Sequence, residues 1–168
     1  TKEAEGTRET LAFTPLSIEG CAYKQIYEAV ARVTDIIQGI KIYTEDGTES
    51  TIQYPNETLH EIITNAVLHR DYSIVSDIHI RIFDNRVEIE SPGILPGHVT
   101  TGNILREQFA RNGSLVRLIN KFPNPPNQDV GEGLNTAFDA MKRMKLKEPQ
   151  IIERDNSVLV SIKHESLA

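Results

Sequence analysis

The sequence predicts an α+β domain, a two-layer α/β sandwich whose mixed, mostly antiparallel sheet carries its helices on one face. Strands are expected at 77–90 and 149–163, where apolar and polar residues alternate. Helices are expected where apolar residues recur at helical spacing, and these helices are amphipathic, so each can cover one sheet face. The expected helices span residues 21–38, 56–70 and 133–145.

The first expected helix is followed by a small hairpin. Its apolar residues at helical spacing are Ile26, Val30, Val33 and Ile37. The next stretch, GIKIYTEDGTESTIQYP, alternates as strands do, and Glu45-Asp46-Gly47 within it predicts a hairpin turn.

The second expected helix begins after Pro55 and runs to about Arg70. Asn56 is the candidate N-cap, and Glu57 suits the positive end of the helix dipole. Strict alternation then returns in DIHIRIFDNRVEIE, which predicts a hairpin that turns at Asp84-Asn85. The apolar positions of this hairpin are Ile78, Ile80, Ile82, Val87 and Ile89.

Between residues 91 and 133 the apolar residues follow no single strand or helix period throughout. This part holds SPGILPGHVTTGN, a short helical stretch RNGSLVRLINKF, and the proline-rich PNPPNQD. Residues 98–130 fit either a lid or an ordinary long surface connection. A helix, LNTAFDAMKRMKL, and two strands, QIIERD and SVLVSIKH, follow.

Composition narrows the class of protein. The chain has 168 residues, 39% of them hydrophobic, which is enough for one domain with a sizeable core. The net charge of −6 disfavours direct binding of nucleic acid by the domain as a whole. The single cysteine, Cys21, excludes an internal disulfide and favours a cytoplasmic setting. No apolar run is long enough to span a bilayer, and the start without methionine suggests a piece of a longer protein.

A polar stripe marks the second helix. Glu61, Asn65 and His69 follow one another at four-residue steps along the edge of its apolar face. An Asn carboxamide oxygen can bind Mg²⁺, and a carboxylate one turn away can activate a water. A solvated helix edge is the alternative interpretation of the same spacing.

Two glycine segments can also carry chemistry. Gly93 follows a strand in a Pro-Gly turn, where a missing Cβ lets a flat base approach the backbone. Gly131 and Gly133 precede a helix, whose N–H groups and dipole favour phosphate. A type II turn and a flexible helix start are the alternatives.

Four segments in this order resemble one family. EIITNAVLHRDY resembles the N-box of the GHKL (Bergerat) ATPases, ESPGILPGH and VGEGLNTAF resemble their glycine boxes, and RNGSLVRLINKF resembles the Arg-Asn segment between them. The HRDY ending indicates the variant of RecG-related helicase-like proteins and Schlafen/Alba-type transcriptional regulators. The resemblance covers roughly residues 20–165, so 1–20 is an N-terminal extension or linker and 21–168 the domain.

The resemblance implies ATP and Mg²⁺ as cofactors and assigns roles by position. Asn65 matches the Mg²⁺-binding Asn, and Glu61 matches the general base of the hydrolytic members. Gly93 matches the glycine beneath the adenine pocket. The other nucleotide-binding candidates are Gly131 and Gly133 as phosphate-loop glycines, with Arg70 and Arg111 as cations for phosphate. His69 and Asp71 are expected to be structural.

Two residues depart from the family pattern. Ser91 stands where typical members have the Asp that accepts the adenine amino proton, and a neutral acceptor is weaker than an ionised one. Glu90 beside it is expected to point to the opposite side of the sheet. Glu132 places a carboxylate between the phosphate-loop glycines, where it would repel phosphate if it faced inward.

Three functions from different classes therefore remain. The first, which the Glu61/Asn65 pair favours and which we predict, is an ATP-binding and hydrolysing domain of a DNA-linked regulator or helicase-like protein. DNA would be contacted through another domain, and a homodimer is a further expected partner. The second is a non-catalytic scaffold or dimerisation module, which Ser91 and Glu132 favour. The third is a direct nucleic-acid binder, which the acidic charge disfavours.

Overall fold

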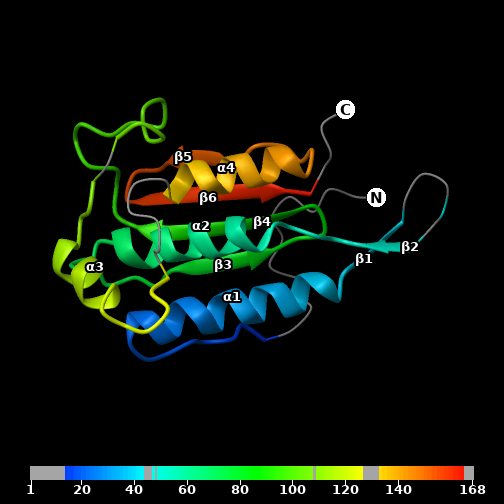
Figure 1. The fold of residues 1–168 in the computed structure, drawn as a ribbon, viewed down its shortest axis with the longest axis horizontal. Helices are drawn as coiled ribbons and strands as arrows, with labels where there is room; N and C mark the ends of the chain where they lie inside the picture. Colours follow the sequence, from blue (N-terminus) through cyan, green and yellow to red (C-terminus); the bar gives the residue numbers. More distant parts are fainter. Residues whose placement is uncertain (1–13, 44–46, 48, 108, 127–132, 165–168) are drawn as a thin grey trace.

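A four-stranded antiparallel sheet forms one layer of the protein (Figure 1). The computed structural model describes residues 14–43, 47, 49–107, 109–126 and 133–164. The strands are β3 (His79–Ile82), β4 (Arg86–Pro92), β5 (Gln150–Glu153) and β6 (Ser157–Lys163), in the order β3-β4-β6-β5. Every pairing among these described strands is antiparallel. The sequence predicts a mixed, mostly antiparallel sheet.

The register places the apolar positions on one face, as the alternation predicts. Ile80 pairs with Ile89 and Ile82 with Val87 across β3 and β4. Val87 and Ile89 are each 1% exposed, because they point toward the helices. This apolar face of the sheet is therefore buried against other elements of the fold.

Three helices cover that face. They are α1 (Ala22–Gln38), α2 (Asn56–His69) and α4 (Gly133–Arg143), and Figure 1 shows them side by side over the strands. The central helix, α2, packs against both α1 and α4 and against β4. The core between the layers includes Val33, Ile37, Ile62, Ile63, Val87, Ile89, Ala137, Met141 and Ile162. Burial of this apolar surface is what holds the two layers together.

The remaining elements lie outside this sandwich. The expected N-terminal hairpin is present as β1 (Lys41–Tyr43) paired antiparallel with β2 (Glu49–Thr51), while two of its expected turn residues, Glu45 and Asp46, lie outside the described residues. The short helix α3 (Gly113–Ile119) packs through Ile119 on the ends of α1 and α2. No helix in the described part of the chain is long and apolar enough to cross a membrane.

One expected detail is wrong: Asn56 is not the N-cap of α2. Pro55 takes that position, with φ −57° and ψ 130°, and Asn56 is the first helical residue. The Pro55 carbonyl accepts the N–H groups of Thr58 at 3.0 Å and Leu59 at 3.3 Å. Proline needs no N–H partner and its φ is fixed, so it suits the entry to a helix.

Candidate functional site

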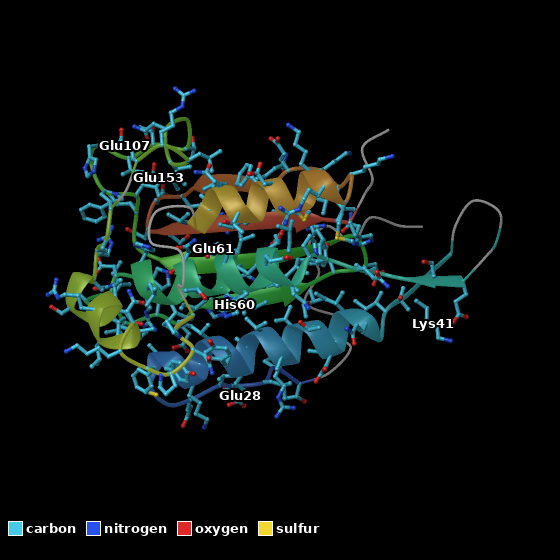
Figure 2. All side chains as sticks on the ribbon, in the orientation of Figure 1. Glu28, Lys41, His60, Glu61, Glu107 and Glu153 are labelled. Atoms are coloured by element: carbon cyan, nitrogen blue, oxygen red, sulfur yellow. The ribbon has the colours of Figure 1, made fainter. Side chains whose placement is uncertain are left out.

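A cavity of about 480 Å³ lies between α2, the loop after β4 and the start of α4. It brings together most of the residues that the sequence marks as candidates. Those that line it are Glu61, Asn65, His69, Ser91, Gly93, Arg111 and Gly133. Figure 2 shows Glu61 between α2 and α4, with Glu107 and Glu153 near the loops at one end of the sheet.

Glu61 and Asn65 form a hydrogen-bonded pair on α2. Asn65 Nδ2 donates to Glu61 Oε1 at 2.7 Å, one helical turn away. This bond leaves Asn65 Oδ1 without a partner among the described residues. Burial raises the pKa of the Glu61 carboxyl, and the hydrogen bond from Asn65 opposes part of that shift. The pair thus offers one carboxylate of increased basicity and one neutral oxygen ligand.

Helix α4 completes this end of the cavity. Its first residue, Gly133, lies directly against the Glu61 carboxyl group. The positive end of the helix dipole therefore stands beside the carboxylate. The other glycine of this segment, Gly131, and the intervening Glu132 lie outside the described residues.

Ser91 lines the cavity and is hydrogen-bonded to α2. Its Oγ donates to the carbonyl oxygen of Ala66 at 2.8 Å. Because the hydroxyl has one proton, Ser91 can only accept a hydrogen bond from a ligand while this bond persists. It is thus an acceptor, as the sequence suggests, but one fixed in orientation by the helix.

Glu90 points away from this site, as the strand alternation predicts. On the open face of the sheet its carboxylate accepts Arg81 Nη1 at 2.7 Å, Arg154 Nη1 at 2.9 Å and Ser157 Oγ at 2.8 Å. Burial alone would raise the pKa of Glu90, but these hydrogen bonds outweigh it and lower the pKa to about 2. Glu90 is therefore part of the sheet's surface and does not replace the family's Asp.

The two candidate arginines have different positions. Arg70 is not among the cavity-lining residues: its Nη2 donates to the Ser76 carbonyl, and its guanidinium lies 5.1 Å from the centre of the Tyr72 ring. Arg111 does line the cavity, and it bonds to Asp71 and to the carbonyl of Ile94. The cavity thus has one of the two expected cations at its wall.

His69 also lines the cavity, at the C-terminal end of α2. Burial lowers the pKa of its imidazole, and the nearby positive charge of Arg111 lowers it further. A neutral ring is therefore favoured at neutral pH. Such a ring can pack beside a ligand or hydrogen-bond to it, but it adds no positive charge.

The sequence did not identify the apolar residues of the cavity or those that the segment after β4 contributes. Its additional lining includes Ile94, Val99, Ile104, Leu105, Arg106, Glu107, Phe109 and Ile151. Asn135 of α4 holds one of these residues by donating from Nδ2 to the Leu105 carbonyl at 3.0 Å. The stretch from Val99 to Phe109 that supplies most of these residues has no helical or strand period, so nothing in its sequence indicated which residues turn inward.

The cavity suits a metal ion that takes one or two ligands from the protein and the others from water and substrate phosphates. Among the described residues, no group of three His, Cys, Asp or Glu side chains could hold a metal. Mg²⁺ keeps several waters and commonly binds through one or two protein oxygens plus substrate phosphates. Asn65 Oδ1, facing a cavity of this size, suits such a partial site.

Comparison with known proteins gives one family and one fold. Residues 76–162, just over half of the chain, match the family model described as putative ATP-dependent DNA helicase RecG C-terminal. The crystal structure of the DIP2311 protein from Corynebacterium diphtheriae is similar, with a TM-score of 0.66 and 19% identity over 86% of this chain. The similarity covers only 28% of that longer chain. No curated protein matches.

Proposed function

Because the chain belongs to the family described as putative ATP-dependent DNA helicase RecG C-terminal, we propose that this ATPase-like domain binds a magnesium nucleotide, with ATP as the expected ligand. The observation that carries the proposal is the Glu61–Asn65 pair, which lines a cavity together with Gly93 and Gly133. The cavity's volume of about 480 Å³ is within the usual range of small-molecule sites.

Two parts of the cavity lining suit different parts of a nucleotide. Gly93 and Ile94 follow Ser91 closely in the chain and line the cavity with it, so a flat base can lie there and donate an amino proton to Ser91 Oγ. In the other part, Gly133 opens α4, whose N–H groups favour phosphate oxygens. Asn65 Oδ1 lies on the α2 side and would bind a Mg²⁺ that neutralises phosphate charge.

Hydrolysis would depend on Glu61. Its buried carboxylate has a raised pKa and is oriented by the hydrogen bond from Asn65, so it can take a proton from a water that attacks a phosphoryl group. Loss of this carboxylate should leave the binding groups in place. Binding and turnover are therefore separable by mutation.

The test compares Asn65→Ala and Glu61→Ala with the wild-type protein. Titration calorimetry with Mg-ATP should show at least a tenfold loss of affinity in Asn65→Ala and little loss in Glu61→Ala, whereas phosphate release should be lost in Glu61→Ala. Asn56→Ala is the matched control, because Asn56 is an exposed residue of the same helix. Equal affinity in the wild type and Asn65→Ala would overturn the proposal.

A non-catalytic scaffold or dimerisation module is the second candidate. Ser91 favours it, because a hydroxyl already bonded to Ala66 is a weaker anchor for a base than a free carboxylate. Absence of Mg-ATP binding by the wild type up to millimolar concentration would support this candidate. In either case the net charge of −6 favours DNA contact through another domain of a longer DNA-linked regulator.

A further inference from the structure

We propose that the ion pair between Asp71 and Arg111 positions the loop after β4, and thereby sets the affinity of the cavity for the base of its ligand. This inference rests on the proposed function, because it concerns the same cavity. It assigns the pair a positioning role, in which Arg111 shapes the site without binding phosphate. The relevant part of the loop is residues 92–96, which we call the base loop.

The base loop lies in direct contact with Asp71. The Asp71 N–H donates to the Pro92 carbonyl at 2.8 Å. Gly93 has φ +108°, and a Cβ at this position would lie 2.7 Å from Asp71 Cβ and 3.3 Å from its backbone nitrogen. Gly93 is therefore required both for its backbone conformation and for the approach of Asp71.

The Asp71 side chain is fixed on both oxygens. Oδ1 accepts the Ser73 N–H at 3.0 Å and the Ser73 hydroxyl at 2.6 Å, while Oδ2 pairs with Arg111 Nη1 at 3.2 Å. The hydrogen bonds from Ser73 lower the pKa of Asp71, and the charge of Arg111 lowers it further. The carboxylate therefore stays ionised at neutral pH and keeps its partner.

Arg111 joins this carboxylate to the base loop. One arm of its guanidinium bonds to Asp71, and the other donates to the carbonyl oxygen of Ile94, which lines the cavity. A planar guanidinium can hold two acceptors in a fixed geometry, which a lysine ammonium on a flexible chain cannot reproduce. Arg111 thus determines where the Ile94 peptide stands relative to α2.

The next residue fixes the same junction from the other side. Asn112 Nδ2 donates to the carbonyls of Leu68 at 2.9 Å and Arg70 at 2.8 Å, which are groups at the C-terminal end of α2. Three segments that are distant in sequence therefore meet at one point: the end of α2, the base loop, and residues 111–112. The pair is at the centre of this junction.

Other contacts hold the base loop to the sheet. Gly93 N–H donates to the Asn156 carbonyl at 2.9 Å, and Leu95 N–H donates to Glu153 Oε1 at 2.8 Å. These bonds attach the loop to the β5–β6 side, whereas Arg111 attaches it to Asp71, just after the C-terminal end of α2. Because Gly93 and Ile94 line the cavity, the distance between its two walls depends on Arg111.

The experiment measures binding of adenosine, ADP and ATP, with Mg²⁺ present, to Arg111→Lys and Asp71→Asn. If the pair positions the base loop, each variant should lose about tenfold in affinity, and by the same factor for all three ligands. The double variant should be little worse than either single variant, because both remove one interaction. Arg32→Lys and Asp35→Asn, at exposed positions of α1, are the controls.

Two results would overturn the proposal. One is wild-type affinity for all three ligands in both variants. The other is a loss that grows from adenosine to ATP, which would make Arg111 a phosphate ligand. Thermal unfolding of each variant shows whether a weaker affinity simply reflects a smaller folded fraction.

Amide exchange gives a readout that does not depend on a ligand. Exchange of the Gly93, Ile94 and Leu95 amides, the three amide protons of the base loop, should be faster in both variants, while exchange in α4 stays at the wild-type rate. If the wild type binds none of the ligands, the proposed function fails, and exchange at 92–96 still decides whether the pair positions the loop. Unchanged exchange there would overturn the positioning role itself.

Discussion

The carboxylate of Glu61 occupies the space in which a side chain on Gly133 would have to stand. A Cβ on Gly133 would lie 2.3 Å from Glu61 Oε1 and 3.1 Å from its Cδ. A carbon and a non-bonded oxygen cannot lie this close, so the side chain of Glu61 or the start of α4 would have to move. The glycine at the start of α4 therefore makes room for the carboxylate, in addition to any role toward phosphate.

Gly133→Ala should displace Glu61 and reduce turnover. We expect at least a tenfold fall in the rate of phosphate release, since a base must stand within hydrogen-bond reach of the water that it activates, and a smaller change in Mg-ATP affinity. Single-turnover kinetics and calorimetry measure the two effects. Gly97→Ala is the matched control, because a Cβ on Gly97 would meet no atom within 4 Å. Unchanged turnover in Gly133→Ala would contradict the prediction.

The imidazole of His69 should take up its proton only at a pH below its ordinary pKa of 6.5. Burial and the charge of Arg111 both lower the pKa, so Arg111→Gln should raise it by removing the second cause. NMR titration of the ring protons measures this change. His60 is an internal control, because burial alone lowers its pKa. An equal rise in the pKa of both rings would mean that the substitution reduced burial throughout the protein and did not act through the charge of Arg111.

The same histidine should make stability depend on pH. The unfolded chain takes up its proton near pH 6.5, whereas the folded protein does so only at lower pH. The stabilising effect of neutral His69 is therefore complete above pH 6.5 and decreases as the pH falls toward its lowered pKa. Denaturant unfolding of His69→Asn and wild type at several pH values tests this sign. The prediction would be contradicted if the difference in unfolding free energy between His69→Asn and wild type were the same at pH 7 and pH 5.

Glu90 should stabilise the sheet at neutral pH and lose this effect in acid. Its pKa falls from 4.5 to about 2 in the folded protein, so its contribution is complete above pH 4.5 and is lost as the pH approaches 2. Glu90→Gln should cost about 2 kcal/mol at pH 7, the scale of hydrogen bonds to a charged group. Urea titrations at pH 7 and pH 3 measure the cost. An equal cost at both values would rule out the charge as its source.

If residues 98–130 are a lid rather than a surface connection, this segment should become better protected when nucleotide binds. Its described part lines the cavity through Ile104 and Leu105, so a bound ligand should stabilise it and slow its amide exchange. Hydrogen exchange with and without Mg-ATP, up to millimolar concentration, measures this effect. Unchanged protection throughout the lid would favour the scaffold function.

The regular elements and part of the site could be predicted from the sequence. Alternation at Ile80, Ile82, Val87 and Ile89 fixed the sheet face, because a strand with one buried face must alternate. The four-residue step from Glu61 to Asn65 likewise fixed their contact, since residues four apart on a helix are neighbours.

Contacts between distant segments could not be predicted in the same way. Asp71 and Arg111 are forty residues apart, and no local period connects them. The sequence indicated only that Asp71 is a structural residue and that Arg111 is a candidate cation for phosphate. Local chemistry also had competing solutions, as at the start of α2, where Pro55 rather than Asn56 takes the N-cap position.

The strand order has a consequence for how the protein is made. The β3–β4 and β5–β6 hairpins are local, but they are joined only through β4 and β6, which pair residues about seventy positions apart. During synthesis on the ribosome, β4 must therefore wait for β6 to emerge before the sheet can close, and such distant pairing is slow. The cavity wall contributed by Ser91 and Val158, which are partners in that register, exists only after this step. In a nascent chain the cavity would thus be incomplete until β6 is in place.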